Sequence, residues 1–130
     1  MTKNILVVDD SFIMRTIIKD IVESDPELKV VGFAENGKVG LQKTRELKPD
    51  ALILDLEMPG MDGLQLQQRL RVDGHIFPII MLTAHGAAAA RIQALRAGAV
   101  AFLQKPCDSE VLLATVESVR QRGGRGRTGH

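Results

Sequence analysis

Short apolar runs alternate along this chain with longer segments in which apolar residues recur at helical spacing. The runs have the length of strands, are rich in β-branched residues and are apolar throughout. Strands of this kind, without alternating polar residues, are typical of a parallel sheet that is covered on both faces. The five runs are ILVVD (5–9), KVVGFA (29–34), ALILD (51–55), PIIMLT (78–83) and AVAFL (99–103).

The segments between the runs show the pattern of amphipathic helices, whose apolar stripe faces a core. Typical cap residues mark their ends, with Asn36, Asp62 and Asp108 at N-cap positions and Gly98 at a C-cap position. Strand and helix therefore alternate five times, which predicts an α/β doubly wound fold. The residues at helical spacing are Ile13, Met14, Ile17, Ile18, Ile21, Val22, Leu64, Leu70, Ile92, Leu95, Leu112, Val116 and Val119.

The charged residues divide the chain into a body and a short basic tail. Residues 1–119 hold all 16 acidic residues and 13 of the 17 basic ones, whereas 120–130 hold four arginines among glycines. A length of 130 residues suits one domain. We expect a globular domain over 1–121 and a disordered Gly/Arg-rich tail or linker stub over 122–130.

Composition and length exclude several classes of protein. The single cysteine, Cys107, cannot form an internal disulfide, and no apolar run reaches the length of a signal peptide or a membrane span. A cytoplasmic protein without a membrane partner is therefore expected. The mildly acidic body and the lack of tryptophan and tyrosine do not favour direct nucleic-acid binding.

Three aspartates follow two of the predicted strands. Asp9 and Asp10 end the first apolar run, and Asp55 ends the third. In a doubly wound sheet these two strands are neighbours, about 4.8 Å apart, so the carboxylates would converge and raise one another's pKa. A divalent cation relieves this repulsion, and an all-oxygen cluster with room for water suits Mg²⁺. The sequence therefore predicts a magnesium site.

Two further polar side chains are expected at the same edge of the sheet. Thr83 ends the fourth apolar run, and Lys105 follows the fifth. A carboxylate beside a metal, a hydroxyl and an ammonium group together form a pocket for a phosphoryl group on Asp55. In that pocket the metal and Lys105 would neutralise the phosphoryl oxygens, and Thr83 would donate a hydrogen bond to one of them.

Four motifs, in this order and at these intervals, resemble the response-regulator receiver domains of two-component signal transduction, chemotaxis regulators among them. They are ILVVDDS, PDALILDLEMPGMDGL, PIIMLTA and AGAVAFLQKP, and the resemblance extends from residue 3 to about residue 121. It implies a flavodoxin-like sheet of five parallel strands in the order 2-1-3-4-5, with helices on both faces.

The resemblance also implies the roles of the acidic residues. Asp55 matches the phosphoacceptor, which receives a phosphoryl group from a histidine kinase in a Mg²⁺-dependent reaction. Asp10 matches the direct metal ligand and Asp9 the ligand that acts mainly through water. Glu57 matches the position whose backbone carbonyl completes the protein ligands. The alternative interpretation is that Asp9 or Asp10 only caps the helix that follows the first strand.

Three residues match the switch of the family. Thr83 and Lys105 match the pair that senses the phosphoryl group, and Phe102 falls on the aromatic switch position. The apolar neighbours of Phe102 leave plain core packing open as an alternative. We also expect a cis bond between Lys105 and Pro106, because the chain must turn sharply while directing Lys105 into the pocket, and related receivers carry one.

Glu57 and His85 occupy family positions that vary beside the pocket. They follow Asp55 and Thr83 by two residues, where a hydrolytic water would enter. We therefore expect them to set the lifetime of the phosphoryl group without deciding whether it is added.

The predicted function is a phosphoacceptor switch and not an enzyme acting on another substrate. A sensor histidine kinase or phosphotransfer protein would supply the phosphoryl group. The face formed by the fourth helix, fifth strand and fifth helix would then be remodelled to control a protein target, and a phosphorylation-dependent homodimer is also allowed.

Three alternatives remain. A Mg²⁺-dependent aspartyl-phosphate phosphohydrolase would carry D-x-D after the first strand, and a nucleotide hydrolase would carry G-x-x-x-x-G-K-[ST]; both motifs are absent. The second alternative is a receiver fold that serves only for protein interaction. The complete set of predicted pocket residues argues against it. The third is the truncated N-terminal receiver of a larger regulator.

Overall fold

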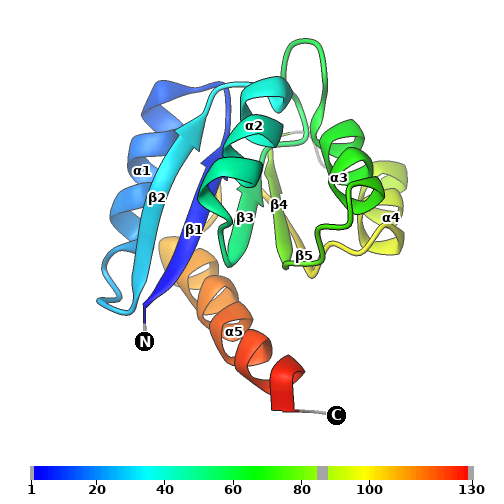
Figure 1. The fold of residues 1–130 in the computed structure, drawn as a ribbon. Coiled ribbons are helices and arrows are strands. Elements are labelled where there is room, and N and C mark those ends of the chain that lie inside the picture. Colours follow the sequence, from blue (N-terminus) through cyan, green and yellow to red (C-terminus); the bar gives the residue numbers. More distant parts are fainter. Residues whose placement is uncertain (1, 85–87, 129–130) are drawn as a thin grey trace.

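The structure is a five-stranded sheet between helices. The computed structural model describes residues 2–84 and 88–128, in which strands and helices alternate strictly (Figure 1). The strands are β1 (Lys3–Val8), β2 (Leu28–Ala34), β3 (Ala51–Leu54), β4 (Ile79–Thr83) and β5 (Ala101–Gln104). The helices are α1 (Phe12–Val22), α2 (Gly37–Leu47), α3 (Gly63–Val72), α4 (Ala88–Arg96) and α5 (Ser109–Thr128).

All neighbouring strands are parallel, and their order is β2-β1-β3-β4-β5. Strand β1 pairs with both β2 and β3, so Val7 lies between Phe33 and Ile53. The predicted α/β doubly wound fold and strand order are confirmed. Because the chain order reverses beside β1, the carboxyl ends of β1 and β3 open at the switch point where such sheets bind ligands.

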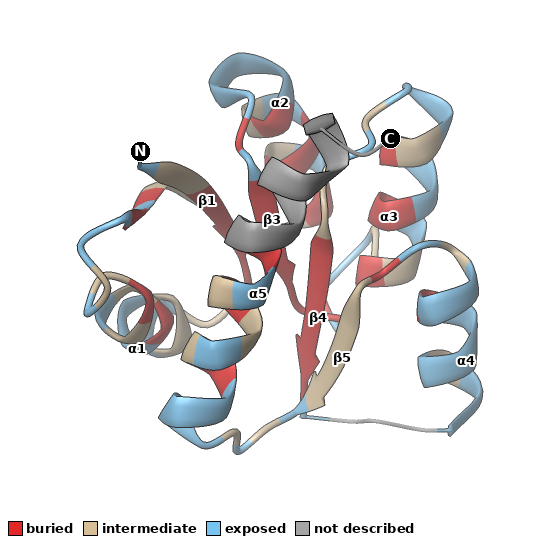
Figure 2. Ribbon diagram, turned by 90° about the horizontal axis from the view of Figure 1, so that it is seen from below, coloured by how far each residue is buried: buried red, intermediate tan, exposed pale blue. Residues whose placement is uncertain are grey.

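Helices cover both faces of the sheet, as the continuously apolar strands predict. Seen along the sheet, α1 and α5 lie on one side and α3 and α4 on the other (Figure 2). One buried cluster joins the first face to Ile18 and Val22 of α1 and to Leu112 and Val116 of α5. The second cluster joins the opposite face to α2, α3 and α4.

Side-chain caps fix where the helices begin. Asn36 and Asp62 cap α2 and α3 as predicted, and Asp62 belongs to a complete capping box. The N-cap of α1 is Ser11, whose side chain accepts a hydrogen bond from the amide of Met14 at 3.2 Å. Neither aspartate at the end of β1 is therefore the N-cap of α1, and that alternative is wrong.

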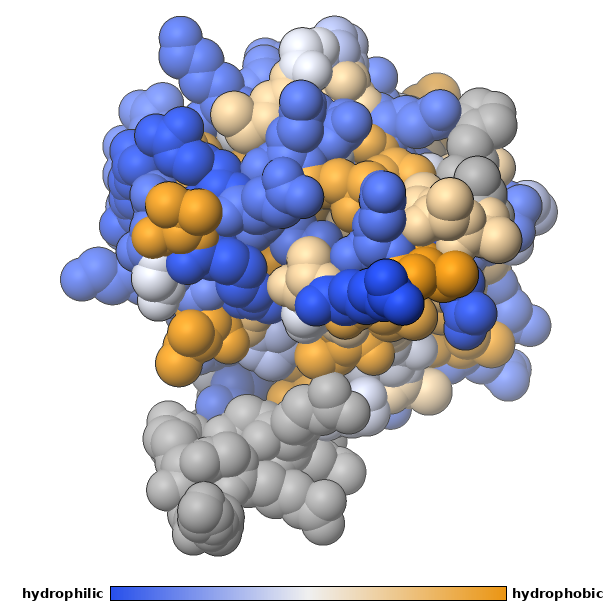
Figure 3. Space-filling view, turned by 90° about the vertical axis from the view of Figure 1, so that its right-hand side faces the viewer, coloured by the Kyte–Doolittle hydropathy of each residue, from blue (hydrophilic) through white to orange (hydrophobic). Residues whose placement is uncertain are grey.

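Two helices depart from the predicted core-facing pattern: Ile13 and Ile17 of α1 are 68% and 45% exposed, and α4 departs further. Ile92 and Leu95 are 51% and 38% exposed, and Ala94 is the buried residue of this helix. The helix lies at the end of the sheet, where it packs against the edge strand β5 and against α3. Fewer neighbours are available there to cover its apolar side chains. Figure 3 shows apolar and strongly hydrophilic residues side by side on this side of the molecule.

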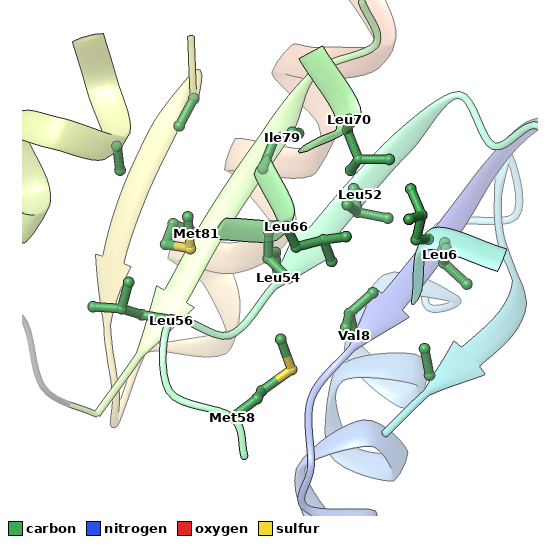
Figure 4. Packing of buried hydrophobic residues seen from close by; sticks show 14 residues of the cluster. Leu6, Val8, Leu52, Leu54, Leu56, Met58, Leu66, Leu70, Ile79 and Met81 are labelled. Carbon is green, nitrogen blue, oxygen red and sulfur yellow. The ribbon is translucent and has the colours of Figure 1, made fainter. Parts of the chain in front are cut away.

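The loop after β3 is anchored in the second buried cluster. Leu56 and Met58 are each 8% exposed and belong to this cluster, and Met58 points into the space between Leu54 and Val8 (Figure 4). Burial of these two side chains, one on each side of residue 57, restricts the loop that follows Asp55. Each contributes about 1.5–3 kcal/mol when fully buried.

Helix α5 begins after Asp108, which accepts a hydrogen bond from the amide of Glu110 at 3.0 Å as an N-cap would. Its backbone is helical to Thr128, across most of the segment 122–130 for which composition predicts disorder. The division into a domain over 1–121 and a tail stays a prediction. Within the described residues, none of the helices is both long and apolar enough to cross a membrane.

Candidate functional site

The carboxyl ends of the central strands bring the predicted site residues to one edge of the sheet. The main-chain ladder continues one residue past the strands, because the amide of Asp55 donates to the carbonyl of Val8 at 2.9 Å. The amide of Lys105 likewise donates to the carbonyl of Thr83 at 2.7 Å. The backbone that carries these side chains is therefore held by the sheet itself.

Three carboxylates converge at this edge, as the strand order predicts. One ligand oxygen from each of Asp9, Asp10 and Asp55 lies within 4.8 Å of the others. Asp9 and Asp55 are buried, at 2% and 6% exposure, and Asp10 is exposed. Two buried carboxylates are costly unless something positive compensates them.

Lys105 supplies positive charge from the other half of the chain. Its Nζ lies 2.7 Å from Oδ2 of Asp9 and 3.6 Å from Oδ2 of Asp55. The lysine side chain is only 13% exposed, so water screens these interactions weakly. The bond between Lys105 and Pro106 is cis, which confirms the prediction.

Asp55 is held in an environment that disfavours its charge. Burial raises the pKa of Asp55 above its ordinary 3.8, and the negative charges of Asp9 and Asp10 raise it further. The ammonium of Lys105 and the amide of Glu57, which donates to Oδ1 of Asp55 at 3.2 Å, act in the opposite direction. Burial is the largest of these effects, so the net direction is upward.

Two residues that position Asp9 were missed by sequence reasoning. The amide of Ser11 donates to Oδ1 of Asp9 at 2.9 Å, and Nη1 of Arg15 donates to the backbone carbonyl of Asp9 at 2.7 Å. The guanidinium of Arg15 also lies over the ring of Phe12, 5.8 Å from its centroid. The sequence signal was a serine directly before a segment with apolar residues at helical spacing, which indicates an N-cap. Arg15 lies one helical turn after Ser11.

The remaining predicted residues occupy different environments. Thr83 is fully buried at the end of β4. Phe102 is partly buried, lies opposite Met81 in the sheet and packs against the second buried cluster; its switch role stays a prediction. Glu57 is exposed. His85 lies outside the described residues.

The donor set at this edge fits a small divalent cation. Three carboxylates and neighbouring backbone carbonyls are oxygen ligands, which suit Mg²⁺ better than transition metals. A surface hollow of about 550 Å³ beside Asp10 and Glu57 leaves room for the waters that Mg²⁺ retains. Asp9, Asp10 and Asp55 are the groups that would hold the ion, and the part of the Glu57 carbonyl stays a prediction.

We predict that Asp55→Asn makes the metal-free protein more stable at neutral pH. Because its pKa is raised, Asp55 binds a proton more tightly in the folded state than in the unfolded state. The free energy of unfolding therefore falls as the pH rises from the unfolded pKa through the folded pKa. The stabilisation of the variant should therefore appear above the unfolded pKa, near the ordinary 3.8, and vanish below it. Thermal melts of both proteins in EDTA across this range check the result.

An Asp50→Asn protein is the matched control, because Asp50 is exposed at the opposite end of β3. A lower melting temperature for Asp55→Asn than for the wild type in EDTA at pH 7 would contradict the argument from burial and repulsion.

Comparison with known proteins places this geometry in a family. Residues 5–117 match the family model described as the response regulator receiver domain. A protein-glutamate methylesterase/protein-glutamine glutaminase from Nocardioides sp. is 42% identical over 120 residues, covering 90% of this chain and 32% of that protein. The homologue from Halalkalibacterium halodurans is 47% identical over 105 residues, covering 78% of this chain and 30% of that protein. The chain spans about a third of the length of these curated relatives.

Solved structures agree with the sequence matches. The response regulator domain of CheB from Thermotoga maritima is 38% identical, with a TM-score of 0.82 and coverage of 95% of this chain and 98% of that one. The receiver domain of a putative Luxo repressor protein from Vibrio parahaemolyticus is 26% identical, with a TM-score of 0.92 and complete coverage of both chains.

Proposed function

This chain belongs to the response regulator receiver domain family of two-component signalling, and from that membership we propose that Asp55 is its phosphoacceptor. The observation that carries the proposal is the buried Asp55 carboxylate, which lies beside two further aspartates and 3.6 Å from the ammonium of Lys105. This combination offers a nucleophile, oxygen ligands for a cation and a counter-charge for phosphoryl oxygens.

The proposed reaction is in-line transfer from a phosphohistidine. A carboxylate oxygen of Asp55 forms a bond to phosphorus while the phosphorus–nitrogen bond breaks, and the imidazole leaves with that electron pair. A bound Mg²⁺ would neutralise the charge on the transferring oxygens. Lys105 is positioned to neutralise a phosphoryl oxygen on Asp55, and the amide of Glu57 holds the other carboxylate oxygen in place.

The proposed switch runs through the paired strands β4 and β5. Thr83 lies at the end of β4. Phe102 of β5 pairs with Met81, which precedes Thr83 by two residues and therefore lies on the same face of β4. A hydrogen bond from the hydroxyl of Thr83 to the phosphoryl group would shift this end of β4. Phe102 would respond by packing more deeply, and the face of α4, β5 and α5 would bind its partner differently.

Labelling of the purified chain tests the proposal. Acetyl phosphate with Mg²⁺ should add one phosphoryl group per molecule, as intact-mass spectra would record, and EDTA should prevent the addition. A sensor histidine kinase or a phosphotransfer protein, which we propose as the cytoplasmic donor, should label the chain faster. Absence of labelling from every donor in the presence of Mg²⁺ would overturn the proposal and favour an interaction module.

We predict that Mg²⁺ raises the melting temperature of the unphosphorylated protein. A ligand that binds only the folded state at a hundred times its dissociation constant stabilises it by about 2.7 kcal/mol. Asp10→Asn should reduce this response while raising the melting temperature without Mg²⁺. The control is Asp20→Asn, an exposed aspartate on α1. If Asp10→Asn melts below the wild type in EDTA, repulsion among the carboxylates is not the cause.

We predict that Glu57 and His85 together set the lifetime of the phosphoryl group. Hydrolysis needs a water in line with the bond from Asp55 to phosphorus, and Glu57 lies exposed two residues beyond Asp55. Replacing both residues by alanine should change the decay rate about tenfold, or roughly 1.4 kcal/mol of barrier. His85→Ala alone should flatten the pH dependence near ~6.5, the ordinary pKa of histidine. Decay of labelled protein after donor removal measures both effects, and unchanged rates would exclude these side chains.

The relatives favour a specific output for the switch. We propose that this receiver controls a protein-glutamate methylesterase/protein-glutamine glutaminase, since the curated relatives are named for that activity. Sequencing the complete reading frame and its neighbours tests this proposal. A DNA-binding domain fused to the receiver, with no methylesterase encoded beside it, would overturn this output and leave the phosphoacceptor proposal intact.

A further inference from the structure

Strand β2 is an edge of the sheet, and its sequence favours pairing with a further strand. It pairs with β1 on one side, and within the described residues no strand lies on its other side. Its residues, LKVVGFA, include a single charged side chain, Lys29, and no proline. Segments that are apolar, β-branched and aromatic add readily to the edge of another sheet when their backbone groups are free.

Lys43 of α2 occupies the outer edge of β2 near the C-terminal end of the strand. Its Nζ donates a hydrogen bond to the carbonyl of Phe33 at 2.5 Å. The next carbonyl, that of Ala34, accepts from the amide of Asp9 at 3.0 Å and so faces β1. Because successive carbonyls of a strand point to opposite sides, the carbonyl of Phe33 faces outward. A further strand would have to displace Lys43 to bind it.

Glu23, the C-cap residue of α1, occupies the same edge nearer the start of β2. Its Oε2 accepts a hydrogen bond from the amide of Val30 at 2.9 Å, and its Oε1 lies 2.9 Å from Nζ of Lys19. The hydrogen bonds from Lys19 and from the amide of Val30 lower the pKa of Glu23, so its carboxylate is charged at neutral pH. One outward donor and one outward acceptor of β2 are therefore both bonded to charged side chains.

A β-bulge separates these two groups. Ile5 pairs with Val30 and Leu6 pairs with Gly32, so Val31 is an extra residue in β2. Bulges and charged side chains are both features by which natural sheets protect a free edge. Their combination on one strand indicates that the outer edge of β2 stays unpaired in the folded protein.

We propose that Glu23 and Lys43 prevent β2 from pairing with β2 of a second copy of this chain. Without these two side chains, the β2 strands of two copies align antiparallel across a two-fold axis and form one continuous sheet. A second copy is the partner concerned, because it brings an identical apolar strand with an identical free edge. The inference does not depend on the proposed phosphoacceptor function.

Glu23→Ala combined with Lys43→Met tests the proposal, because it removes both side-chain partners while the methionine keeps an unbranched stem. Sedimentation velocity of the full chain should show self-association about tenfold tighter than that of the wild type. Glu46→Ala combined with Lys38→Met is the matched control, with the same charge changes at exposed positions of α2. Hydrogen exchange locates the contact: in the test variant, the amide of Val30 should exchange fast in dilute protein and slowly in concentrated protein.

Partial unfolding would also cause association, and a third substitution distinguishes it from strand pairing. Val31→Lys, added to Glu23→Ala and Lys43→Met, places like charges close together in the paired strands and should restore the sedimentation of the wild type. Association of the test variant no tighter than that of the wild type, or equal association of the control, would overturn the proposal. So would association that persists after Val31→Lys, or exchange at the amide of Val30 that is independent of protein concentration.

Discussion

Asp55→Asn is expected to abolish labelling of the chain by acetyl phosphate and by a phosphohistidine donor. The amide keeps the size of the side chain, and its oxygen can still accept the hydrogen bond from the amide of Glu57. It lacks the negative charge that makes the carboxylate oxygen a nucleophile. The loss should be complete and should occur without unfolding, because the variant removes a buried charge whose pKa is raised.

Intact-mass spectra after incubation with Mg²⁺ and donor measure this effect, and melting curves confirm that the variant is folded. Asp50→Asn serves again as the control, since it makes the same chemical change at the other end of β3. Equal labelling of wild type and Asp55→Asn would assign the phosphoryl group elsewhere. Peptide mapping would then decide whether Asp9 or Asp10 carries it.

Gly63→Ala is expected to cost about 3 kcal/mol of stability and to slow phosphoryl transfer. A Cβ at position 63 would press against the backbone carbonyl of Asp55 and lie 2.8 Å from Cα of Leu56. The amide of Gly63 also donates to the carbonyl of Leu56 at 2.8 Å, so the first turn of α3 cannot move away freely. Relief of the clash must displace the backbone that carries Asp55, the proposed phosphoacceptor.

Gly60→Ala is the control within the same loop. Gly60 has a φ of +76°, and a Cβ there would meet no atom within 4 Å, so only backbone strain of about 1–2 kcal/mol is added. Urea unfolding of both variants and initial labelling rates separate the two effects. If Gly60→Ala is the more damaging change, conformational strain and not steric contact governs this loop.

The strands, and the meeting of three aspartates at one edge of the sheet, could be predicted because local sequence and topology determine them together. A parallel sheet covered on both faces leaves no polar residue inside a central strand, so the ends of ILVV and ALIL were visible in the printed sequence. Once β1 and β3 are neighbours, Asp9, Asp10 and Asp55 must meet. This step needed no knowledge of side-chain conformations.

The failures of prediction concern tertiary neighbours. Ile92 and Leu95 have the spacing of a core stripe, but α4 lies over an edge strand and too few elements surround it. The 2.7 Å ion pair between Lys105 and Asp9, which are 96 positions apart in the sequence, was likewise not foreseen. A pairing of that range depends on the exact placement of two strand ends, which no local pattern encodes.

The ion pair between Lys105 and Asp9 gives the metal-free protein a counterion of its own. The ammonium is tethered at 2.7 Å from the carboxylate, so its local concentration does not depend on the composition of the surrounding solution. A newly synthesised chain can therefore complete its sheet without waiting for a divalent cation. Under the proposed function, Mg²⁺ would then be needed only for phosphoryl transfer, so removal of the ion would prevent labelling of Asp55 without unfolding the protein.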